Sequence, residues 1–201
     1  STKIIYGSGL EDKIGIQEYL DNEFSIAGNS FSKYRYLSNI YNLDEAIFNK
    51  KISLPETSKS YHYKFLSKKY NSSGGMHVGN NIFSKNIYYQ KYLPGKTYSI
   101  SFIANGEYSK ILGLNQLFLV KDNIKFPFLH AGAMNLGLSE ANIDFPKNFI
   151  SSICNLYQIK GYCSIDFKII NNKIYILDFN PRLSSSYRLY TRKYENLMHH
   201  H

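Results

Sequence analysis

Apolar and polar positions alternate along residues 161–186, which read GYCSIDFKIINNKIYILDFNPRLSSS. Two strand-like runs flank the turn-forming residues Asn171 and Asn172, so this stretch predicts a β-hairpin. A two-residue loop would mix carboxylates with apolar side chains on both faces. A three-residue loop, residues 171–173, makes one face wholly apolar, and burial of that face favours it because a one-residue slip turns every side chain over. The predicted register has Ile165 facing Phe179, Phe167 facing Leu177, Ile169 facing Tyr175 and Asp166 facing Asp178.

The predicted register places two carboxylates on the polar face, directly across from each other. Directly opposed residues have Cβ atoms roughly 4.5 to 5.5 Å apart, so two ionised carboxylates there repel. A proton on one carboxylate or a cation between them would offset the repulsion. Mg²⁺ suits an oxygen-only site, and Asn180 adds a neutral oxygen ligand on the same face. The planar guanidinium of Arg182 is suited to anionic oxygens. The hairpin therefore predicts a metal and phosphate site, and an ordinary solvated face with scattered charges is the alternative.

Hydrophobic periodicity predicts the remaining elements. Short apolar or alternating runs predict strands at residues 3–8, 24–27, 61–69, 87–92, 98–104 and 110–120. Helical periodicity predicts a helix between the first two strands, one or two helices over residues 31–48, and a helix opened by Pro146. The side chains expected to face inward are Ile14, Ile16, Tyr19 and Leu20 in the first helix and Phe149, Ile150, Ile153, Cys154 and Tyr157 in the last.

Two glycine-containing turns are candidates for phosphate binding. The first, residues 7–9, follows a strand, but Asp12 stands where a dinucleotide-binding motif has its third glycine, so a plain tight turn is favoured. The second, in residues 71–78, reads NSSGGMHV, and its successive N–H groups could line one concavity that favours anions. It lacks the GxxxxGK[ST] pattern of a Walker loop. A β-hairpin tip with exposed lysines is the alternative interpretation of this second turn.

Composition and charge narrow the possible ligands. The chain of 201 residues is 43% hydrophobic and 16% aromatic, which excludes disorder, and it lacks an apolar run long enough to span a bilayer. The net charge of +9 permits nucleic-acid binding, but the lysines are spread along the chain, so anionic small molecules are favoured. Cys154 and Cys163 lack metal-ligand spacing and are expected to be reduced thiols in a cytoplasm. The absence of an initial methionine suggests that upstream sequence was removed.

The hairpin resembles the ATP-grasp superfamily. The acidic strand residue Asp166 is followed twelve residues later by Asp178-x-Asn180-Pro181-Arg182, which is similar to the magnesium motif of that superfamily, where the second acid is usually glutamate. The resemblance implies an α/β (α+β) fold of two lobes whose antiparallel sheets hold ATP between them. It divides the chain into a remnant of a preceding α/β domain at residues 1–30 and an ATP-grasp domain at residues 31–201. Residues 61–90 would be the glycine-lid subdomain and residues 91–201 the metal-binding and ATP-binding subdomain.

The same resemblance implies roles for individual residues. Lys68, with Lys64 as second choice, would be the phosphate-binding lysine next to a lid formed by Ser73, Gly74 and Gly75. Backbone groups of the segment QKYL would bind adenine, with Gln90 replacing a frequent glutamate. The implied nucleotide-binding set is Lys68, Ser73, Gly74, Gly75, Gln90, Lys91, Tyr92, Leu93 and Asp178, the metal ligands are Asp166, Asp178 and Asn180, and the catalytic pair is Arg182 and Lys68. ATP and Mg²⁺ are the implied cofactors, with Mn²⁺ as the alternative metal.

More narrowly, four segments resemble an ATP-grasp group associated with tetrahydromethanopterin or methanofuran-type one-carbon metabolism: YGSGLED, SSGGMHV, YYQKYLPG and GYCSIDF. The nearest characterised relatives by that resemblance join tyramine and glutamate. The implied reaction activates a small-molecule carboxylate as an acyl phosphate and joins it to an amine. Two alternatives stay open, a nucleotide-binding protein that has lost catalysis and a basic nucleic-acid-binding module. The substrates, the number of metals and the oligomeric state are left open.

Overall fold

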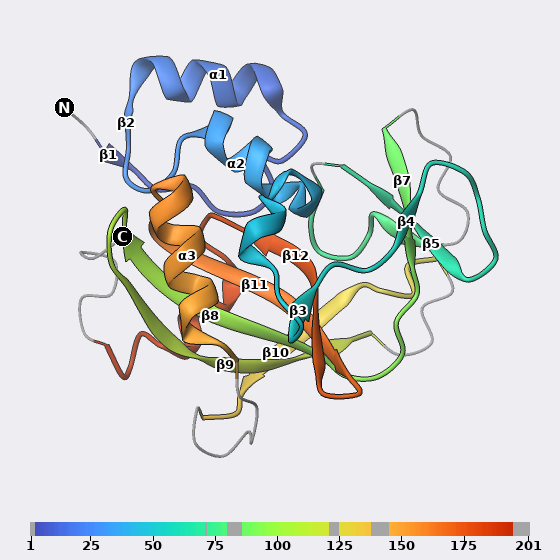
Figure 1. The fold of residues 1–201 in the computed structure, drawn as a ribbon. Helices are drawn as coiled ribbons and strands as arrows, with labels where there is room; N and C mark the ends of the chain where they lie inside the picture. Colours follow the sequence, from blue (N-terminus) through green and yellow to red (C-terminus); the bar gives the residue numbers. More distant parts are fainter. Residues whose placement is uncertain (1–2, 71, 80–85, 121–124, 138–144, 195–201) are drawn as a thin grey trace.

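The computed structural model describes residues 3–70, 72–79, 86–120, 125–137 and 145–194 (Figure 1). Its central element is a six-stranded sheet in the order β10-β9-β8-β11-β12-β3, antiparallel except where β12 pairs with β3. The strands are β10 (His130–Asn135), β9 (Ser109–Leu119), β8 (Thr97–Asn105), β11 (Lys160–Ile170), β12 (Lys173–Asn180) and β3 (Ile52–Ser53). The long central strands follow the runs of β-branched and aromatic residues that predicted them.

A second sheet of four short strands has the order β4-β7-β5-β6 and is antiparallel. Its strands are β4 (Thr57–Ser58), β7 (Ile87–Lys91), β5 (Phe65–Lys69) and β6 (Val78–Gly79). Near the N-terminus, β1 (Lys3–Ile4) and β2 (Ser25–Ile26) form a separate parallel pair. This mixed α+β architecture with two antiparallel sheets confirms the predicted fold class. The boundary placed at residue 30 stays a prediction.

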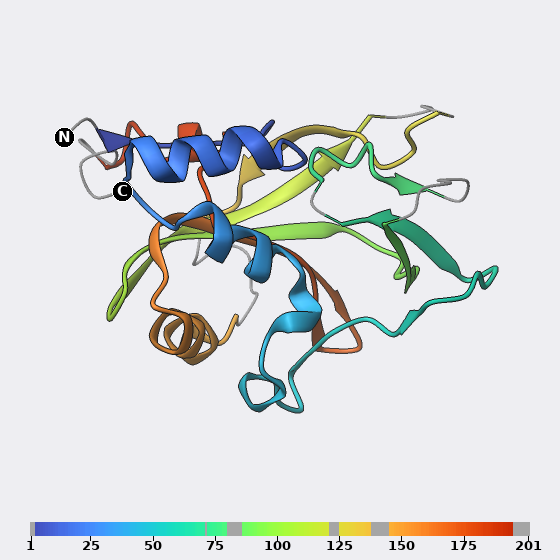
Figure 2. The same ribbon diagram turned by 90° about the horizontal axis from the view of Figure 1, so that it is seen from above.

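The described helices are few, and two of them cover one face of the six-stranded sheet (Figure 2). They are α1 (Ile14–Glu23), α2 (Phe31–Ser38) and α3 (Lys147–Tyr157), with short 3₁₀ turns η1 (Ile40–Asn42), η2 (Glu45–Ile47) and η3 (Ser185–Leu189). Figure 2 shows α2 and α3 on the same side of the sheet. The predicted apolar stripe of α3 is confirmed, since Phe149, Ile150, Ile153 and Cys154 are buried in the main core. The two cysteines, Cys154 and Cys163, are free and buried.

The β11–β12 hairpin has the predicted pairing of the two acids but a different loop. The loop contains only Asn171 and Asn172, both with positive φ, 50° and 60°, as a two-residue turn of the mirror-image type requires. The predicted three-residue loop is therefore wrong, and so are the facing pairs Phe167–Leu177 and Ile169–Tyr175. A β-bulge at Leu177 adds one residue and restores the register, so that Asp166 still faces Asp178.

The bulge also explains how the hairpin buries apolar side chains on both sides of the register shift. On the loop side of the bulge Phe167 faces Ile176, and beyond it Ile165 faces Phe179. All four side chains are at most 1% exposed, and each contributes roughly 1.5 to 3 kcal/mol by leaving water. One inserted residue therefore keeps the apolar face continuous and the acids on the other face.

Helix α1 has an orientation that the sequence did not predict. Ile14, Ile16 and Tyr19, expected to face inward, are each at least half exposed, whereas Gln17 is fully buried. The Gln17 amide donates to the backbone carbonyls of Leu10 and Glu11 and accepts from Arg35 on α2. These polar contacts fix the helix rotation, and only Leu20 of the predicted set packs against a small cluster of buried aromatic residues.

The N-terminal segment is attached to the hairpin through Asn29. Its side-chain Nδ2 donates to the backbone carbonyls of Lys160 (2.8 Å) and Pro181 (3.0 Å), and its Oδ1 accepts from the Lys160 amide (3.0 Å). Asn29 is only 3% exposed. These buried bonds place the N-terminal residues against the end of β12, next to the polar face of the hairpin.

Candidate functional site

A cavity of about 420 Å³ lies between the six-stranded and the four-stranded sheets. Its volume is within the range of about 300 to 1,000 Å³ that is usual for small-molecule sites. Every residue of the implied nucleotide-binding, metal-binding and catalytic sets lines this cavity, although each role stays a prediction. The lining includes Lys68, Ser73, Gly74, Gly75, Gln90, Lys91, Tyr92, Leu93, Asp166, Asp178, Asn180 and Arg182, together with Ser8, His77, Ser99, His130, Ser164 and Lys168.

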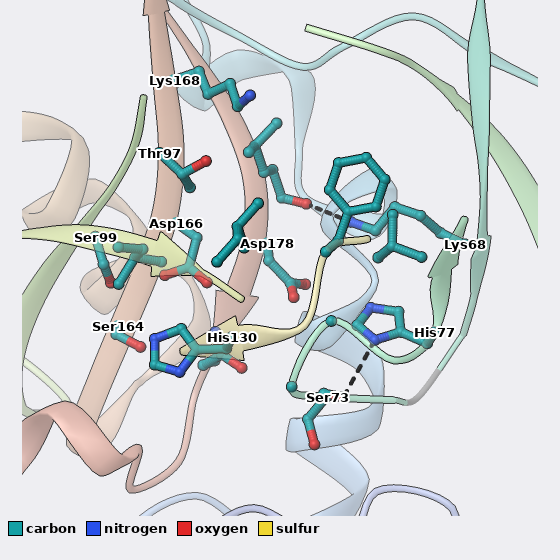
Figure 3. A pocket seen from close by; sticks show the side chains of 18 of the residues that line it. Lys68, Ser73, His77, Thr97, Ser99, His130, Ser164, Asp166, Lys168 and Asp178 are labelled. Atoms are coloured by element: carbon teal, nitrogen blue, oxygen red, sulfur yellow. Dashed lines mark hydrogen bonds between the residues drawn. The ribbon is translucent and has the colours of Figure 1, made fainter. Parts of the chain in front are cut away.

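The two acids occupy the floor of the cavity, which is the polar face of the hairpin. Figure 3 shows Asp166 and Asp178 next to each other, with Lys68 approaching from the opposite sheet. Desolvation, and next the charge of Asp178, raise the pKa of Asp166 from 3.8 to about 7. Near neutral pH the pair of carboxylates is therefore partly protonated unless a bound cation replaces the proton. This is the electrostatic problem that the sequence predicted.

The donor set fits Mg²⁺ held partly by a bound phosphate. Within the described ranges there is no group of three or more His, Cys, Asp and Glu side chains that could hold a metal ion. Mg²⁺ is commonly held by one or two carboxylates plus substrate phosphates, which is what this pair offers. Asn180 lies beside the pair, since it faces Ser164 two residues beyond Asp178. The site would therefore be completed by the nucleotide.

Lys68 on β5 spans the cavity. It is 6% exposed, and its Nζ donates to the backbone carbonyl of Leu177 at 2.9 Å. Leu177 is the bulged residue, whose backbone is left out of the regular ladder. The alternative lysine, Lys64, is exposed and lies over the ring of Tyr63. Of the two candidates, only Lys68 lines the cavity.

The glycine turn of the lid contacts the opposite sheet. The Gly74 carbonyl accepts a hydrogen bond from the His130 amide at 3.1 Å. Gly75 has φ of 80°, and a Cβ added there would lie 1.8 Å from the carbonyl oxygen of Phe128. His77 is buried, and its Nδ1 lies 3.3 Å from the Ser73 carbonyl. The turn therefore needs glycine both for its conformation and for its close approach to residues 128–130.

The hinge segment has several of its polar groups already paired. The amides of Lys91 and Tyr92 donate to the carbonyls of Glu56 and Lys64, each at 2.8 Å. The Gln90 side chain donates to the Tyr41 hydroxyl at 2.8 Å. A nucleobase would therefore have fewer hinge groups to bind than the sequence suggested.

Lys168 is a cavity residue to which the sequence analysis assigned no role. Its Nζ donates to the Leu93 carbonyl at 2.6 Å and lies 5.4 Å from the centre of the Tyr92 ring. Burial lowers the pKa of Lys168. Because strand side chains alternate, its position two residues after Asp166 placed it on the cavity face, and this pattern could have identified it.

Arg182 is held by a second residue that the sequence did not assign. Its guanidinium Nη2 lies 2.9 Å from Oε1 of Glu11 and donates to Oδ1 of Asn180 at 3.0 Å. Its Nη1 donates to the Leu183 carbonyl at 3.3 Å. Arg182 and Glu11 are each 5% exposed. The signal for Glu11 was present in the segment YGSGLED, but no local pattern connected it to Arg182.

Three comparisons with known proteins agree with this geometry. A family model described as ATP-grasp domain matches residues 37–186. Two curated proteins of Methanocaldococcus jannaschii are each 27% identical to the chain: the uncharacterized protein MJ0776 over 81% of the chain, and a tyramine–L-glutamate ligase over 61%. The chain spans 45% and 37% of the lengths of these two relatives.

Solved structures show the same fold. An ATP-grasp superfamily protein of Archaeoglobus fulgidus superposes with a TM-score of 0.65 at 18% identity, over 90% of this chain and 57% of that one. The biotin carboxylase domain of the Hydrogenobacter thermophilus 2-oxoglutarate carboxylase, solved with MgADP, gives 0.68 at 10% identity, over 94% and 49%. The predicted two-lobed fold is thereby confirmed. None of the helices in the described ranges has the length and apolar character needed to cross a bilayer.

Proposed function

The chain belongs to the ATP-grasp family, and from this premise we propose that it binds Mg·ATP between its two larger sheets and uses it to join a carboxylate to an amine. The single observation that carries the proposal is the facing pair Asp166 and Asp178, with Lys68 reaching the same cavity from the other sheet. An opposed pair of acids is costly in an empty cavity, and a divalent cation with phosphate oxygens offsets that cost.

The proposed reaction has two steps. A carboxylate oxygen attacks the γ-phosphorus of ATP, the bond from that phosphorus to the bridging oxygen breaks, and ADP leaves. The nitrogen of a neutral amine then attacks the acyl carbon, the bond from that carbon to the phosphate oxygen breaks, and the nitrogen loses a proton. Such phosphoryl transfer depends on alignment and charge neutralisation more than on covalent help from the protein.

The residues of the cavity would supply those two requirements. Asp166, Asp178 and Asn180 would hold Mg²⁺, which supplies charge neutralisation at the phosphates when bound. Lys68 is fixed by one hydrogen bond to Leu177, so the remaining ammonium protons are available to phosphate oxygens. The lid turn, in contact with residues 128–130, would exclude water from the acyl phosphate.

The finer assignment rests on the relatives. One curated relative is named for joining tyramine to L-glutamate, so these two compounds are the first substrate pair to test. We place the activity in one-carbon cofactor biosynthesis on the resemblance of the lid and hinge segments. The partners proposed are small molecules and exclude nucleic acid.

The test of metal and nucleotide binding is calorimetric titration of ATP into the full chain with and without MgCl₂. We expect Mg²⁺ to strengthen binding by at least about tenfold, or about 1.4 kcal/mol. The Asp166→Asn/Asp178→Asn variant should lose that gain. The control Glu107→Gln alters an exposed acid at the tip of the β8–β9 hairpin and should keep it. Retention of the gain by the double variant would exclude this metal site.

Turnover is tested separately by ADP release in the presence of a carboxylate and an amine. We expect release only when both substrates are present together with Mg²⁺. If Mg·ATP binds and no pair of substrates releases ADP, a nucleotide-binding protein without catalysis becomes the better account. Steeply salt-dependent oligonucleotide binding that is indifferent to Asp166→Asn would instead support a nucleic-acid-binding module.

A further inference from the structure

We propose that Glu11 is a positioning residue for the metal site, which it serves by holding the guanidinium of Arg182 away from the two facing acids. This inference rests on the proposed function, because it assigns a role within the same Mg²⁺ and nucleotide site. It connects the N-terminal segment, which lies outside the matched family region, to the chemistry of the hairpin.

The observation is a buried ion pair that joins distant parts of the chain. Oε1 of Glu11 lies 2.9 Å from Nη2 of Arg182, and the two side chains are 6% and 5% exposed. Ion pairs at the surface contribute little, but a buried pair fixes the geometry of both partners because neither charge is stable there alone. Arg182 therefore has its orientation set by a residue from the loop before α1.

Glu11 itself is held firmly in place. Its second carboxylate oxygen accepts the Gly9 amide at 2.6 Å. Its own backbone carbonyl accepts from the side chain of Gln17, which is fully buried and also bonded to Arg35. The carboxylate is thus presented on a rigid turn supported by two helices, which is the kind of support that orients ligand-binding groups.

The other side of Arg182 contacts the proposed metal ligands. Nη2 also donates to Oδ1 of Asn180, so Arg182 is in direct contact with one of the residues proposed to hold Mg²⁺. If Glu11 loses its charge, the carboxylates that line the same cavity as Arg182 are the two facing acids. Arg182 would then occupy oxygens that Mg²⁺ needs, and the net charge around the two acids would become more positive by one unit, which disfavours a cation there.

A purely structural role makes different predictions. The N-terminal segment is already attached to the hairpin by the three hydrogen bonds of Asn29. If Glu11 only strengthens that attachment, its loss should lower thermal stability without changing the effect of Mg²⁺ on nucleotide binding. If Glu11 positions Arg182, its loss should change the Mg²⁺ effect specifically.

The experiment titrates ADP into the full chain with and without MgCl₂ for the wild type, Glu11→Gln, Glu11→Asp, Asn29→Ser and Asp12→Asn. Glu11→Gln should reduce the Mg²⁺-dependent gain in affinity by about 10 to 100-fold, as losses of groups that orient metal ligands do, while affinity without Mg²⁺ stays unchanged. Glu11→Asp should recover part of the gain. Asn29→Ser should lower the melting temperature and keep the gain. Asp12→Asn is the matched control, since that neighbouring acid is about half exposed and pairs with Lys13 at the surface.

A spectroscopic measurement reports on Arg182 directly. The chain has four arginines, Arg35, Arg182, Arg188 and Arg192, and Arg182 is the only one that is buried. In protein labelled with ¹⁵N-arginine, its Nε–H resonance, assigned by its loss in Arg182→Lys, should exchange slowly with water and should broaden or shift in Glu11→Gln.

The outcomes separate the two proposals. If the wild type shows no Mg²⁺-dependent binding, the proposed function fails, whatever the resonance shows. If the wild type shows it and Glu11→Gln keeps the whole gain with an unchanged Arg182 resonance, Glu11 is not a positioning residue and the proposed function stands.

Discussion

The two larger sheets face the same cavity but are built very differently. The six-stranded sheet has long strands and an apolar face in which Ile165, Phe167 and Phe179 are at most 1% exposed. The four-stranded sheet includes strands of two residues, and beside it Tyr61 and Tyr63 are 63% and 74% exposed. The first sheet carries the facing acids on a rigid floor, while the second brings Lys68 and the glycine turn over them. We infer that stability resides in the floor and that ligand closure depends on the lid.

The largest expected effect tests whether the six-stranded sheet provides most of the stability. Phe167→Ala removes a fully buried ring from the floor and should lower the free energy of unfolding by about 3 to 5 kcal/mol. Tyr63→Ala, at an exposed position in the turn before β5, should change it by less than about 0.5 kcal/mol. Urea unfolding followed by circular dichroism measures both. Equal losses would show that the two sheets share one core.

The next effect tests how the lid contacts the opposite sheet. Gly75→Ala would place a Cβ 1.8 Å from the Phe128 carbonyl, whereas Gly74→Ala, also at positive φ, meets no atom within 4 Å. Both variants pay roughly 1 to 2 kcal/mol for a left-handed alanine, but only Gly75→Ala must move the turn away from residues 128–130. Mg·ATP affinity should fall by more than about tenfold in Gly75→Ala and much less in Gly74→Ala. Similar losses in titration calorimetry would contradict the proposed contact.

A smaller effect is expected from the lysine that crosses the cavity. Lys68→Met removes the bond to Leu177 and the charge proposed for the phosphates, and should weaken ATP binding by about tenfold while costing only about 1 kcal/mol in stability. Lys64→Met, at the exposed neighbouring lysine, is the control and should bind ATP as the wild type does. The assignment of Lys68 fails if the two variants bind ATP equally well.

The last prediction concerns pH. Burial raises the pKa of Asp166 from 3.8 to about 7, so the folded protein without metal holds a proton that the unfolded chain has released across that window. Stability without Mg²⁺ should therefore fall as pH rises from 3.8 toward 7. The stabilisation by Mg²⁺ should grow over the same window and level off above it. Melting temperatures across pH, with and without MgCl₂, measure this, and Asp166→Asn should remove the trend.

The sequence predicted the acid pair more reliably than the loop beside it. The alternation of Ile165, Phe167 and Phe179 requires one buried face, and this requirement, together with a short turn at Asn171 and Asn172, sets Asp166 against Asp178. The route to that register, a two-residue turn followed by a bulge at Leu177, depends on backbone conformations of Asn171 and Asn172 that the pattern does not specify. Burial of the apolar face constrains the strand register, but more than one loop geometry is compatible with burying that face.

Other parts of the site lay beyond local patterns. The pairing of Glu11 with Arg182 and the support of Leu93 by Lys168 join residues far apart in the chain, and no periodicity connects them. The predicted rotation of α1 was wrong, because the helix buries the side-chain amide of Gln17 and exposes its isoleucines. Polar contacts of this kind fix the orientation of a helix, and they are not visible in its hydrophobic pattern.

The most direct test of the account is to locate a bound metal. Crystals grown with ADP and MnCl₂, with Mn²⁺ standing in for Mg²⁺, would give an anomalous signal from the metal alone. We predict a peak between the carboxylates of Asp166 and Asp178, bridged to the ADP phosphates. Bound ADP with its metal coordinated by other residues, or with no metal between these two acids, would contradict the central claim.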